Sequence, residues 1–227
     1  MAVESRFVVT IDGPSGAGKS TISRGLAARL GFTYLDTGAM YRAVGLKMER
    51  EGIDPADEAA LARCLAAVEI ELIPAGDDDV KVRLNGEDVS AAIRTPEMAM
   101  VASRVSALPA VRARLTELQR EMGAKGGIVA EGRDMGTVVF PGAPYKFYLD
   151  ASPEVRAKRR LEQLQLRGQN PAYQEILDQI KKRDYDDSRR AISPLKPASD
   201  AINVDSSHIG AEAVVDLMLA HIGKTRT

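Results

Sequence analysis

The chain has 227 residues, of which 44% are hydrophobic and 28% charged, as in an ordinary globular protein with one sizeable core. Its 31 basic and 32 acidic side chains leave a formal net charge of -1, so no broad positive field is available to hold a nucleic acid or an anionic membrane. One cysteine, Cys64, and two histidines can build neither a disulfide framework nor a Cys/His zinc cluster. We expect a cytoplasmic protein without a signal peptide or membrane span, because the apolar run near the start covers only residues 7–11.

Strand and helix signals alternate along the chain. Residues 7–11 form a β-branched apolar run that leads into a Gly-rich turn, and residues 19–30 carry apolar side chains at helical spacing until Gly31. Further apolar runs of strand length cover residues 127–130, 144–149 and 201–204. Uninterrupted apolar runs are typical of strands buried on both faces, so the pattern predicts an α/β fold with a doubly wound parallel sheet.

The segment between the first and second halves has a different pattern. It is expected to hold helices over residues 39–50 and from Asp54, as N-cap, to about Val68. Alternating residues around an Asn-Gly turn then predict a small antiparallel insertion near residues 69–90, with strands over 69–73, 80–84 and 87–90. The acidic run 77–79 is expected to be a solvated hairpin tip.

Four helices are predicted from proline and serine or threonine signals in the second half of the chain. Thr95-Pro96 opens one helix, and Pro109 opens another that runs to about Lys125. Ser152-Pro153 opens an Arg-rich helical segment that a break at residues 167–171 divides into two helices.

One motif indicates nucleotide binding. Directly after the first strand, the chain matches the pattern G-x-x-x-x-G-K-[ST] at every fixed position, with residues Gly13, Pro14, Ser15, Gly16, Ala17, Gly18, Lys19 and Ser20. Backbone N–H groups of such a loop cradle phosphates, Lys19 is expected to reach the β- and γ-phosphates of ATP, and Ser20 to offer Mg²⁺ a hydroxyl. Thr21 supplies a second hydroxyl beside it.

The phosphate-binding loop leaves several classes of protein open. A GTPase switch would carry D-x-x-G and [NT]-K-x-D elements, and neither occurs in the sequence. A motor ATPase would normally be larger and carry a Walker-B acid, for which the only approximations are Glu131 and Asp150. A small-molecule kinase remains, with a non-catalytic nucleotide-binding regulator as its rival. Such a kinase must gather repelling anions, which suits a chain with 21 Arg and 10 Lys.

Two further stretches place an arginine beside glycines just beyond an apparent strand. They are LDTGAMYR at residues 35–42 and EGRDMGT at residues 131–137. Doubly wound sheets bind ligands at the carboxyl ends of their strands, so both stretches are expected at the binding edge.

With these motifs the chain closely resembles the bacterial cytidylate kinases, a branch of the nucleoside monophosphate kinases. The resemblance extends over nearly the whole length and includes GPSGAGKST, LDTGAMYR, EGRDMGTVVFP, RDYDDSRR and SPLKPASDA. It implies ATP-dependent, Mg²⁺-assisted phosphorylation of CMP, and of dCMP, in pyrimidine metabolism. It also implies a P-loop core (1–36, 126–151 and 169–227), a CMP-binding lobe (37–125) and a lid (152–168).

The resemblance assigns roles to individual residues. The acceptor phosphate would be held by Arg42, Arg133 and Arg190, with Thr37 and Tyr41 nearby; cytosine would be read by Ser103, Arg112 and Asp134, and the ribose by Arg183 and Asp187. Cytosine offers an amino donor beside two acceptors, which suits a carboxylate with a guanidinium. In the competing account, Asp134 only holds Arg133 in a structural ion pair. A kinase with the same loop could instead phosphorylate UMP, a sugar acid or shikimate.

Arginines of the lid are expected to close on the donor phosphates. Arg159 and Arg160 are the leading candidates, with Arg156 and Arg167 in the same segment, and with Lys19 they form the predicted catalytic set. No general base is needed, because a phosphate monoester with a second pKa near 6 is already largely dianionic at neutral pH. We expect a monomer with CMP or dCMP and ATP as its only partners.

Overall fold

The computed structural model describes residues 6–75, 79–166 and 168–224. At its centre lies a parallel sheet of five strands in the order β2-β6-β1-β7-β8. The strands are β1 (Val8–Asp12), β2 (Thr33–Asp36), β6 (Ile128–Gly132), β7 (Tyr145–Asp150) and β8 (Ile202–Asp205). The predicted α/β fold with a parallel core sheet is therefore confirmed.

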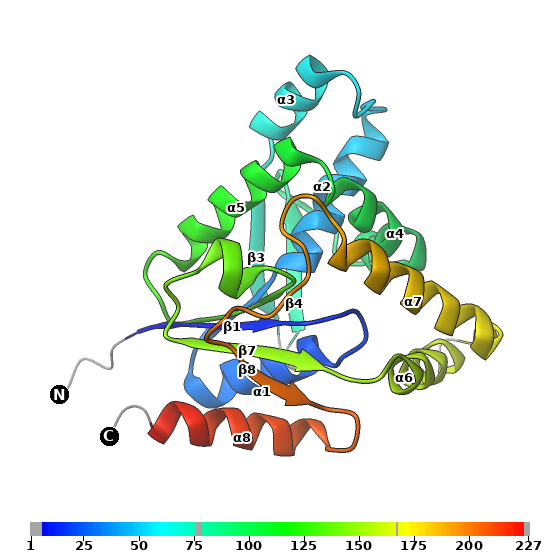
Figure 1. Cartoon of the computed structure of the whole chain (residues 1–227). Coiled ribbons are helices and arrows are strands. Elements are labelled where there is room, and N and C mark those ends of the chain that lie inside the picture. The colour runs from blue at the N-terminus through cyan, green and yellow to red at the C-terminus, as the bar shows by residue number, and fades with distance from the viewer. Residues whose placement is uncertain (1–5, 76–78, 167, 225–227) are drawn as a thin grey trace.

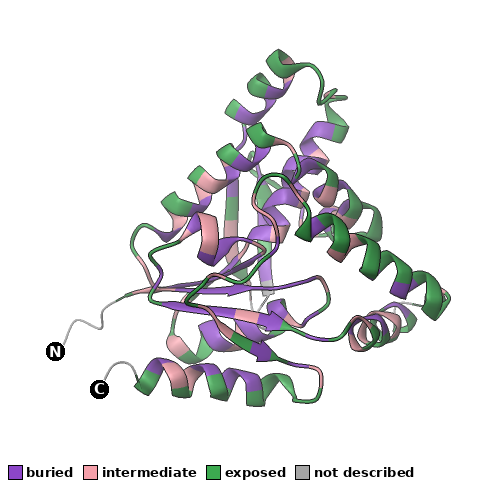
Figure 2. Ribbon diagram, in the orientation of Figure 1, coloured by how far each residue is buried: buried purple, intermediate pink, exposed green. Residues whose placement is uncertain are grey.

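Helices cover both faces of this sheet (Figure 1). On one face, α1 (Lys19–Leu30) and α8 (Ala211–Lys224) pack against each other, and on the other lie α2 (Thr37–Arg50) and α5 (Pro109–Gly123). Because both faces are covered, the central strands are buried along nearly their whole length, as Figure 2 shows in purple. This double burial is the physical reason why the strands are uninterrupted apolar runs in the sequence.

A second sheet lies in the segment between α2 and α5. It is antiparallel, with strands in the order β3 (Ile70–Ala75), β4 (Asp79–Leu84) and β5 (Glu87–Asp88). The predicted antiparallel insertion is confirmed, although β5 is shorter than expected because the Ser90 hydroxyl accepts the Val82 N–H at 2.9 Å. Residues 76–78, and with them Asp77 and Asp78 of the predicted acidic tip, lie outside the described residues.

The remaining helices of this segment are α3 (Glu58–Ala66), α4 (Pro96–Val105) and the 3₁₀ turn η1 (Ala92–Arg94). The predicted start of α3 was wrong. The carboxylate of Asp54 accepts the Ala56 N–H in a local turn, whereas Asp57 accepts the Ala60 N–H at 2.9 Å and caps the helix. Asp54 and Asp57 could each cap this helix. Asp57 is the N-cap because its side chain accepts the N–H three residues ahead, which is the spacing of an N-cap contact.

Two helices stand beside the carboxyl edge of the main sheet. They are α6 (Pro153–Gln165) and α7 (Tyr173–Ser188), which pack on each other through their own small apolar core. This confirms the predicted division of the Arg-rich segment. Arg167, in the turn between them, lies outside the described residues. Within the described part of the chain, no helix is long and apolar enough to cross a membrane.

Candidate active site

The phosphate-binding loop lies between β1 and α1, at the carboxyl edge of the sheet. Gly13 has φ +150°, and a Cβ there would lie 1.9 Å from the Leu149 carbonyl oxygen of β7, so only glycine fits. No side chain caps the first turn of α1, which leaves its N–H groups open toward the loop. An anion is the natural partner of such a helix end.

Lys19 is buried at the base of this loop. Its Nζ donates to the Pro14 carbonyl oxygen at 2.7 Å, which holds the side chain across the loop. Burial, with the positive charges of Arg133 and Arg183, lowers the pKa of Lys19 to about 7, although Glu131 acts in the opposite direction. The free site therefore disfavours the charged form of Lys19, and a bound anion would stabilise that form.

Oxygen groups converge below the start of α1. Ser20 and Thr21 are exposed in its first turn, and the buried carboxylate of Glu131 accepts the hydroxyl hydrogen of Tyr34. Burial and the nearby carboxylate of Asp36 raise the pKa of Glu131, whereas hydrogen bonding to Ser20 lowers it. The raising effects dominate, so the free site disfavours the charged form of the Glu131 carboxyl group beside Ser20.

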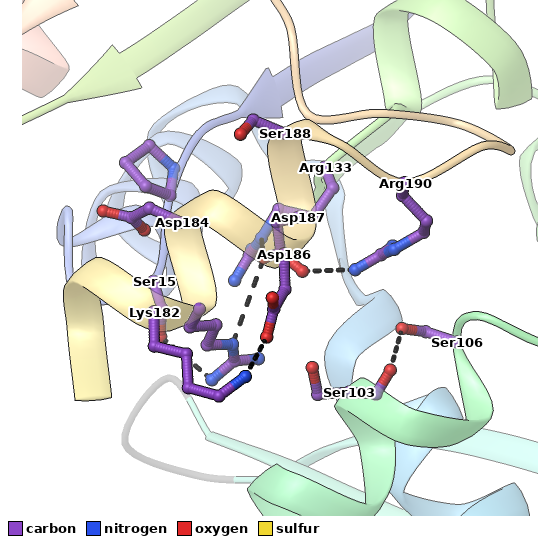
Figure 3. A network of polar contacts seen from close by, with 12 residues as sticks. Ser15, Ser103, Ser106, Arg133, Lys182, Asp184, Asp186, Asp187, Ser188 and Arg190 are labelled. Carbon is purple, nitrogen blue, oxygen red and sulfur yellow. Dashed lines mark hydrogen bonds and ion pairs between the residues drawn. The ribbon is translucent and has the colours of Figure 1, made fainter. Parts of the chain in front are cut away.

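Four arginines gather beside the loop, and three of them surround one buried carboxylate, where Figure 3 labels Arg133 and Arg190. Asp187 of α7 accepts from Arg133 Nε at 2.9 Å and from Arg190, and Arg183 Nε lies 4.0 Å away. Burial alone would raise the pKa of Asp187, but these arginines outweigh it and hold the pKa low. Asp187 can neutralise only one of the three positive charges.

The fourth arginine, Arg42 of α2, adds to the excess of positive charge. It pairs with Asp36 at 3.3 Å, and its Nε is buried without a hydrogen-bond partner among the described residues, as is Nε of Arg183. Burial, together with Arg133, Arg42 and Arg190, lowers the pKa of Arg183 to about 10. Crowded guanidinia with unused donors form a site prepared for a multiply charged anion.

Arg112 and Asp134 form a second, nearly dry polar group. The two side chains are hydrogen-bonded ion-pair partners, 5% and 2% exposed, and Arg112 Nη1 also donates to the Ser106 carbonyl oxygen at 3.1 Å. The Tyr41 ring lies 5.6 Å from the Arg112 guanidinium. The Ser103 carbonyl accepts the Ser106 hydroxyl at 2.8 Å, which places Ser103 at the same corner.

This pairing contradicts one account of Asp134. The hypothesis that Asp134 holds Arg133 is wrong, because Arg133 pairs with Asp187 and Asp134 pairs with Arg112. Residues 133 and 134 are neighbours in the chain, but their side chains serve different parts of the site.

The start of α2 joins β2 to the site. The Asp36 carboxylate accepts the Ala39 N–H at 2.8 Å and caps the helix, which therefore begins at Thr37, two residues before the predicted start. The Thr37 hydroxyl donates to the Glu131 carbonyl oxygen at 2.6 Å. LDTGAMYR and EGRDMGT thus lie side by side, as β2 pairs with β6 in parallel.

The arginines of α6 lie at the side of the loop. Arg156 is buried, with Nη2 2.6 Å from the Asp184 carboxylate and Nη1 3.1 Å from the Ser15 carbonyl oxygen. Arg159 donates to the Ser206 carbonyl oxygen at 2.6 Å. Arg160 is half-buried on the same helix. The structure brings Arg156 and Arg159 to the rim of the loop and not to the arginine cluster.

Some residues that build the site carry no clear signal in the sequence. Asp12 and Asp36 end two strands, and Asp184 holds Arg156; none of the three is predicted to have a role. Each aspartate at a strand end directly precedes a glycine- or threonine-rich turn, which is the only signal that could have identified it. The contacts of Asp12 lie more than a hundred residues along the chain and become visible only in the fold, whereas Asp36 contacts the nearby Ala39 and Arg42.

The family described as "Cytidylate kinase" matches residues 9–224. A cytidylate kinase from Pasteurella multocida is 47% identical over 220 residues, covering 97% of this chain and 96% of its own. Another, from Mycobacterium leprae, is 51% identical over 214 residues, covering 93% of this chain and 94% of its own. Similarity of this extent includes both sheets and every predicted site residue.

Among solved structures, an uncharacterized protein from Eubacterium ventriosum superposes with a TM-score of 0.51. The match covers 96% of this chain and 99% of that one, at 10% identity. At such low identity the likeness concerns the fold alone.

Proposed function

Because this chain belongs to the cytidylate kinase family, we propose that it transfers the γ-phosphoryl group of ATP to CMP, giving ADP and CDP. The observation that carries this function is the cluster of four arginines facing the phosphate-binding loop, with the Arg112–Asp134 pair beside it. One anion site is then available for the donor and another for a nucleotide acceptor.

The acceptor phosphate is assigned to Arg42, Arg133 and Arg190. Arg133 and Arg190 now contact Asp187, and a phosphate dianion can take over their donors and use the free Nε of Arg42. Asp187 would then be free to turn with Arg183 to the ribose hydroxyls. Thr37 and Tyr41 complete the wall of this site from α2.

The base is assigned to the Arg112–Asp134 corner. Asp134 would accept from the 4-amino group of cytosine, while Arg112 donates to N3 and O2, and Ser103 adds a hydroxyl. Because both charged groups are almost fully buried, a base with the opposite donor pattern leaves them mispaired, which is costly in a dry site.

The donor triphosphate is assigned to residues 13–21. Open N–H groups of the loop and of α1 would hold the phosphates, and Lys19 would neutralise charge as it builds up on the transferring group. Arg159 and Arg160, at the rim, would close over the same phosphates and exclude water.

The groups near Ser20 fit a magnesium ion. Mg²⁺ prefers oxygen ligands and usually takes one or two from the protein, the rest coming from phosphates and water. Ser20 would hold it directly, and the positive ion would favour the charged form of the nearby Glu131, whose pKa burial and Asp36 raise in the free protein. When bound, the ion neutralises phosphate charge. Among the described residues, no cluster of three or more carboxylate, histidine or cysteine ligands occurs.

The reaction needs no general base. An acceptor phosphate oxygen attacks the γ-phosphorus in line, and this chain's contribution is to align two anions and offset their repulsion. We assign the lobe 37–125 to CMP, the segment 152–168 to a lid and the remainder to the ATP-binding core. We further propose that dCMP is accepted and that the enzyme acts as a cytoplasmic monomer.

A coupled assay of ADP release with CMP, dCMP, UMP, AMP and shikimate tests the function. We expect the highest kcat/KM for CMP, and the R112M variant should lose this preference while retaining ATP binding. Turnover only with shikimate or another non-nucleotide would refute the proposal. ATP binding without turnover of any acceptor would favour a nucleotide-binding regulator.

A further inference from the structure

Asp12, the last residue of β1, makes contacts that the proposed mechanism does not use. Its two carboxylate oxygens accept the N–H groups of Met135 and Gly136, each at 2.8 Å. Asp12 is 3% exposed, so the carboxylate is held in place without competition from bulk water. A buried carboxylate with two charge-assisted hydrogen bonds to consecutive N–H groups is a strong backbone clamp.

The clamped residues open a short π-helix, η2 (Met135–Val139). Asp134 occupies its N-cap position, yet its side chain makes no capping hydrogen bond, because that carboxylate is paired with Arg112. Asp12, from another strand, instead accepts the first two N–H groups of η2, which have no acceptor within a helix. Asp12 thus takes the capping role at η2, and the Asp134 side chain remains available to pair with Arg112.

The backbone around Arg133 and Asp134 is fixed on both sides. Before them, Gly132 ends β6 and stands opposite Asp12 in the pairing of β1 with β6. After them, the two hydrogen bonds to Asp12 hold the next peptide groups. One residue of β1 therefore sets the position of both ends of a two-residue segment that carries a phosphate-binding arginine and the base-reading aspartate.

Packing leaves little freedom for this loop to move on the clamp. A Cβ at Gly136 would lie 3.0 Å from Thr10 Oγ1 and 3.4 Å from Asp12 Oδ2, so the loop backbone rests directly on these side chains. The charge of Asp134 also opposes that of Asp12. The repulsion between these two buried carboxylates costs free energy, which an apolar residue at position 12 would avoid.

We propose that Asp12 is a positioning residue for recognition of the acceptor base, acting by capping η2 in place of Asp134. This inference rests on the proposed function, since it assigns Asp12 to the cytosine site of that reaction. It predicts that a defect at Asp12 appears in discrimination between bases and not in binding of the donor nucleotide.

The test compares Asp12→Asn with Asp57→Asn. The side-chain oxygen of an asparagine at position 12 can accept one of the two N–H groups. Its NH2 group then faces the other N–H and cannot accept it. Asp57 also accepts a backbone N–H at a helix start, but in the distal α3, so it controls for loss of a capping carboxylate. In Asp12→Asn, we expect kcat/KM for CMP to fall about tenfold or more while that for UMP falls much less.

Donor binding provides the second readout. The dissociation constant of a non-hydrolysable ATP analogue, measured by calorimetry, should be unchanged in Asp57→Asn. In Asp12→Asn it should change much less than kcat/KM for CMP, because the charge of Asp12 acts only weakly on Lys19. Parallel losses for CMP and UMP, or a matching loss of ATP-analogue affinity, would overturn the inference, because either result indicates general structural damage.

Hydrogen exchange tests the clamp without any variant or turnover. In the free wild-type protein, the amides of Met135 and Gly136 should exchange slowly; exchange at the rate of exposed loop amides would overturn the inference even if Asp12→Asn failed to fold. If the wild-type enzyme showed no activity with CMP, the proposed function would fail, whereas slow exchange would still report the clamp.

Discussion

At the scale of single residues, the candidate active site holds more positive charges than the carboxylates paired with them can neutralise. Lys19, Arg42, Arg133, Arg183 and Arg190 face the same space, and Asp187 can balance only part of their charge. The lowered pKa values of Lys19 and Arg183 reflect this deficit. A bound triphosphate and monophosphate would remove it, so the free site stores electrostatic free energy that favours the ternary complex.

Replacement of Lys19 by alanine should abolish most turnover. Removing a preorganised cation from the transferring phosphate is expected to lower kcat about 10²-fold or more. The variant should still fold, because the Lys19 ammonium contacts a carbonyl oxygen of the loop and not the apolar core. Thermal denaturation checks this. Steady-state kinetics with saturating CMP provides the measurement, and a kcat within threefold of wild type would contradict the role of Lys19.

ATP binding at pH 8 should take up a proton. With a pKa of about 7 in the free protein, Lys19 is largely neutral at this pH, and the triphosphate charge should raise its pKa and restore the ammonium. Calorimetry in buffers of different ionisation enthalpy measures the uptake. We expect the proton uptake to be much smaller in Lys19→Met, which serves as the control. Equal uptake in both proteins would show that a group other than Lys19 takes up the proton.

Asp134→Asn should narrow the difference between CMP and UMP. For the wild-type protein we expect a preference for CMP on the order of 10²-fold or greater in kcat/KM, since UMP mispairs with both buried groups. Asparagine can donate to O4 of uracil, so the variant should lose activity mainly with CMP. Steady-state kinetics of Asp134→Asn with CMP and UMP provides the measurement. Equal losses of kcat/KM for the two nucleotides would show that Asp134 does not recognise the base.

At the scale of elements, α7 connects the two halves of the site. Its residue Asp184 pairs with Arg156 of α6, Arg183 donates to the Ser15 hydroxyl at 3.2 Å, and Asp187 gathers arginines from the acceptor side. Arg156 in turn donates to the Ser15 carbonyl oxygen. One helix therefore contacts the phosphate-binding loop, α6 and the arginine cluster, which we propose to be the donor site, the lid and the acceptor site.

Loss of the Arg156 side-chain charge should destabilise this junction. Arg156→Met leaves the partly buried Asp184 carboxylate without its partner and removes donors to two carbonyl oxygens, so the free energy of unfolding should fall by about 2 kcal/mol. Urea denaturation provides the measurement. Lys158→Met is the control on the exposed face of the same helix; equal effects in the two variants would contradict a structural role for the Arg156 pair.

At the scale of the whole molecule, the sheet separates two apolar cores and gathers the ends of its strands at one edge. The larger core lies between the sheet and the helices that carry the small antiparallel sheet, and the other lies between the sheet, α1 and α8. The buried charges of the candidate site lie at the shared edge and not inside either core. The stability of the molecule is therefore linked to pH through groups at its active site.

The free energy of unfolding should depend on pH through the ionisation of Asp12. Burial raises the pKa of Asp12 from 3.8 to about 6, so its contribution to stability is present below pH 4 and is lost as the pH rises through 6. From pH 4 to 7, the wild-type protein should lose roughly 1–3 kcal/mol relative to Asp12→Asn. Urea denaturation of both proteins across this range measures the difference, and a difference independent of pH would refute the prediction.

The sequence by itself determined the features that depend on local chain conformation. The phosphate-binding loop, its helix and the positions of four of the five core strands could be predicted, because glycine placement, capping residues and apolar runs act over a few neighbours. Where two local signals competed, as at Asp54 and Asp57, the prediction was wrong by a few residues.

Tertiary structure alone decided which charges meet. Asp134 pairs with Arg112 and not with its neighbour Arg133, and Asp12 caps a helix that lies more than a hundred residues away in the chain. Family resemblance named several of these residues, but not their partners in the free protein. Such contacts depend on the register of parallel strands, which brings distant segments to one edge and which no local pattern encodes.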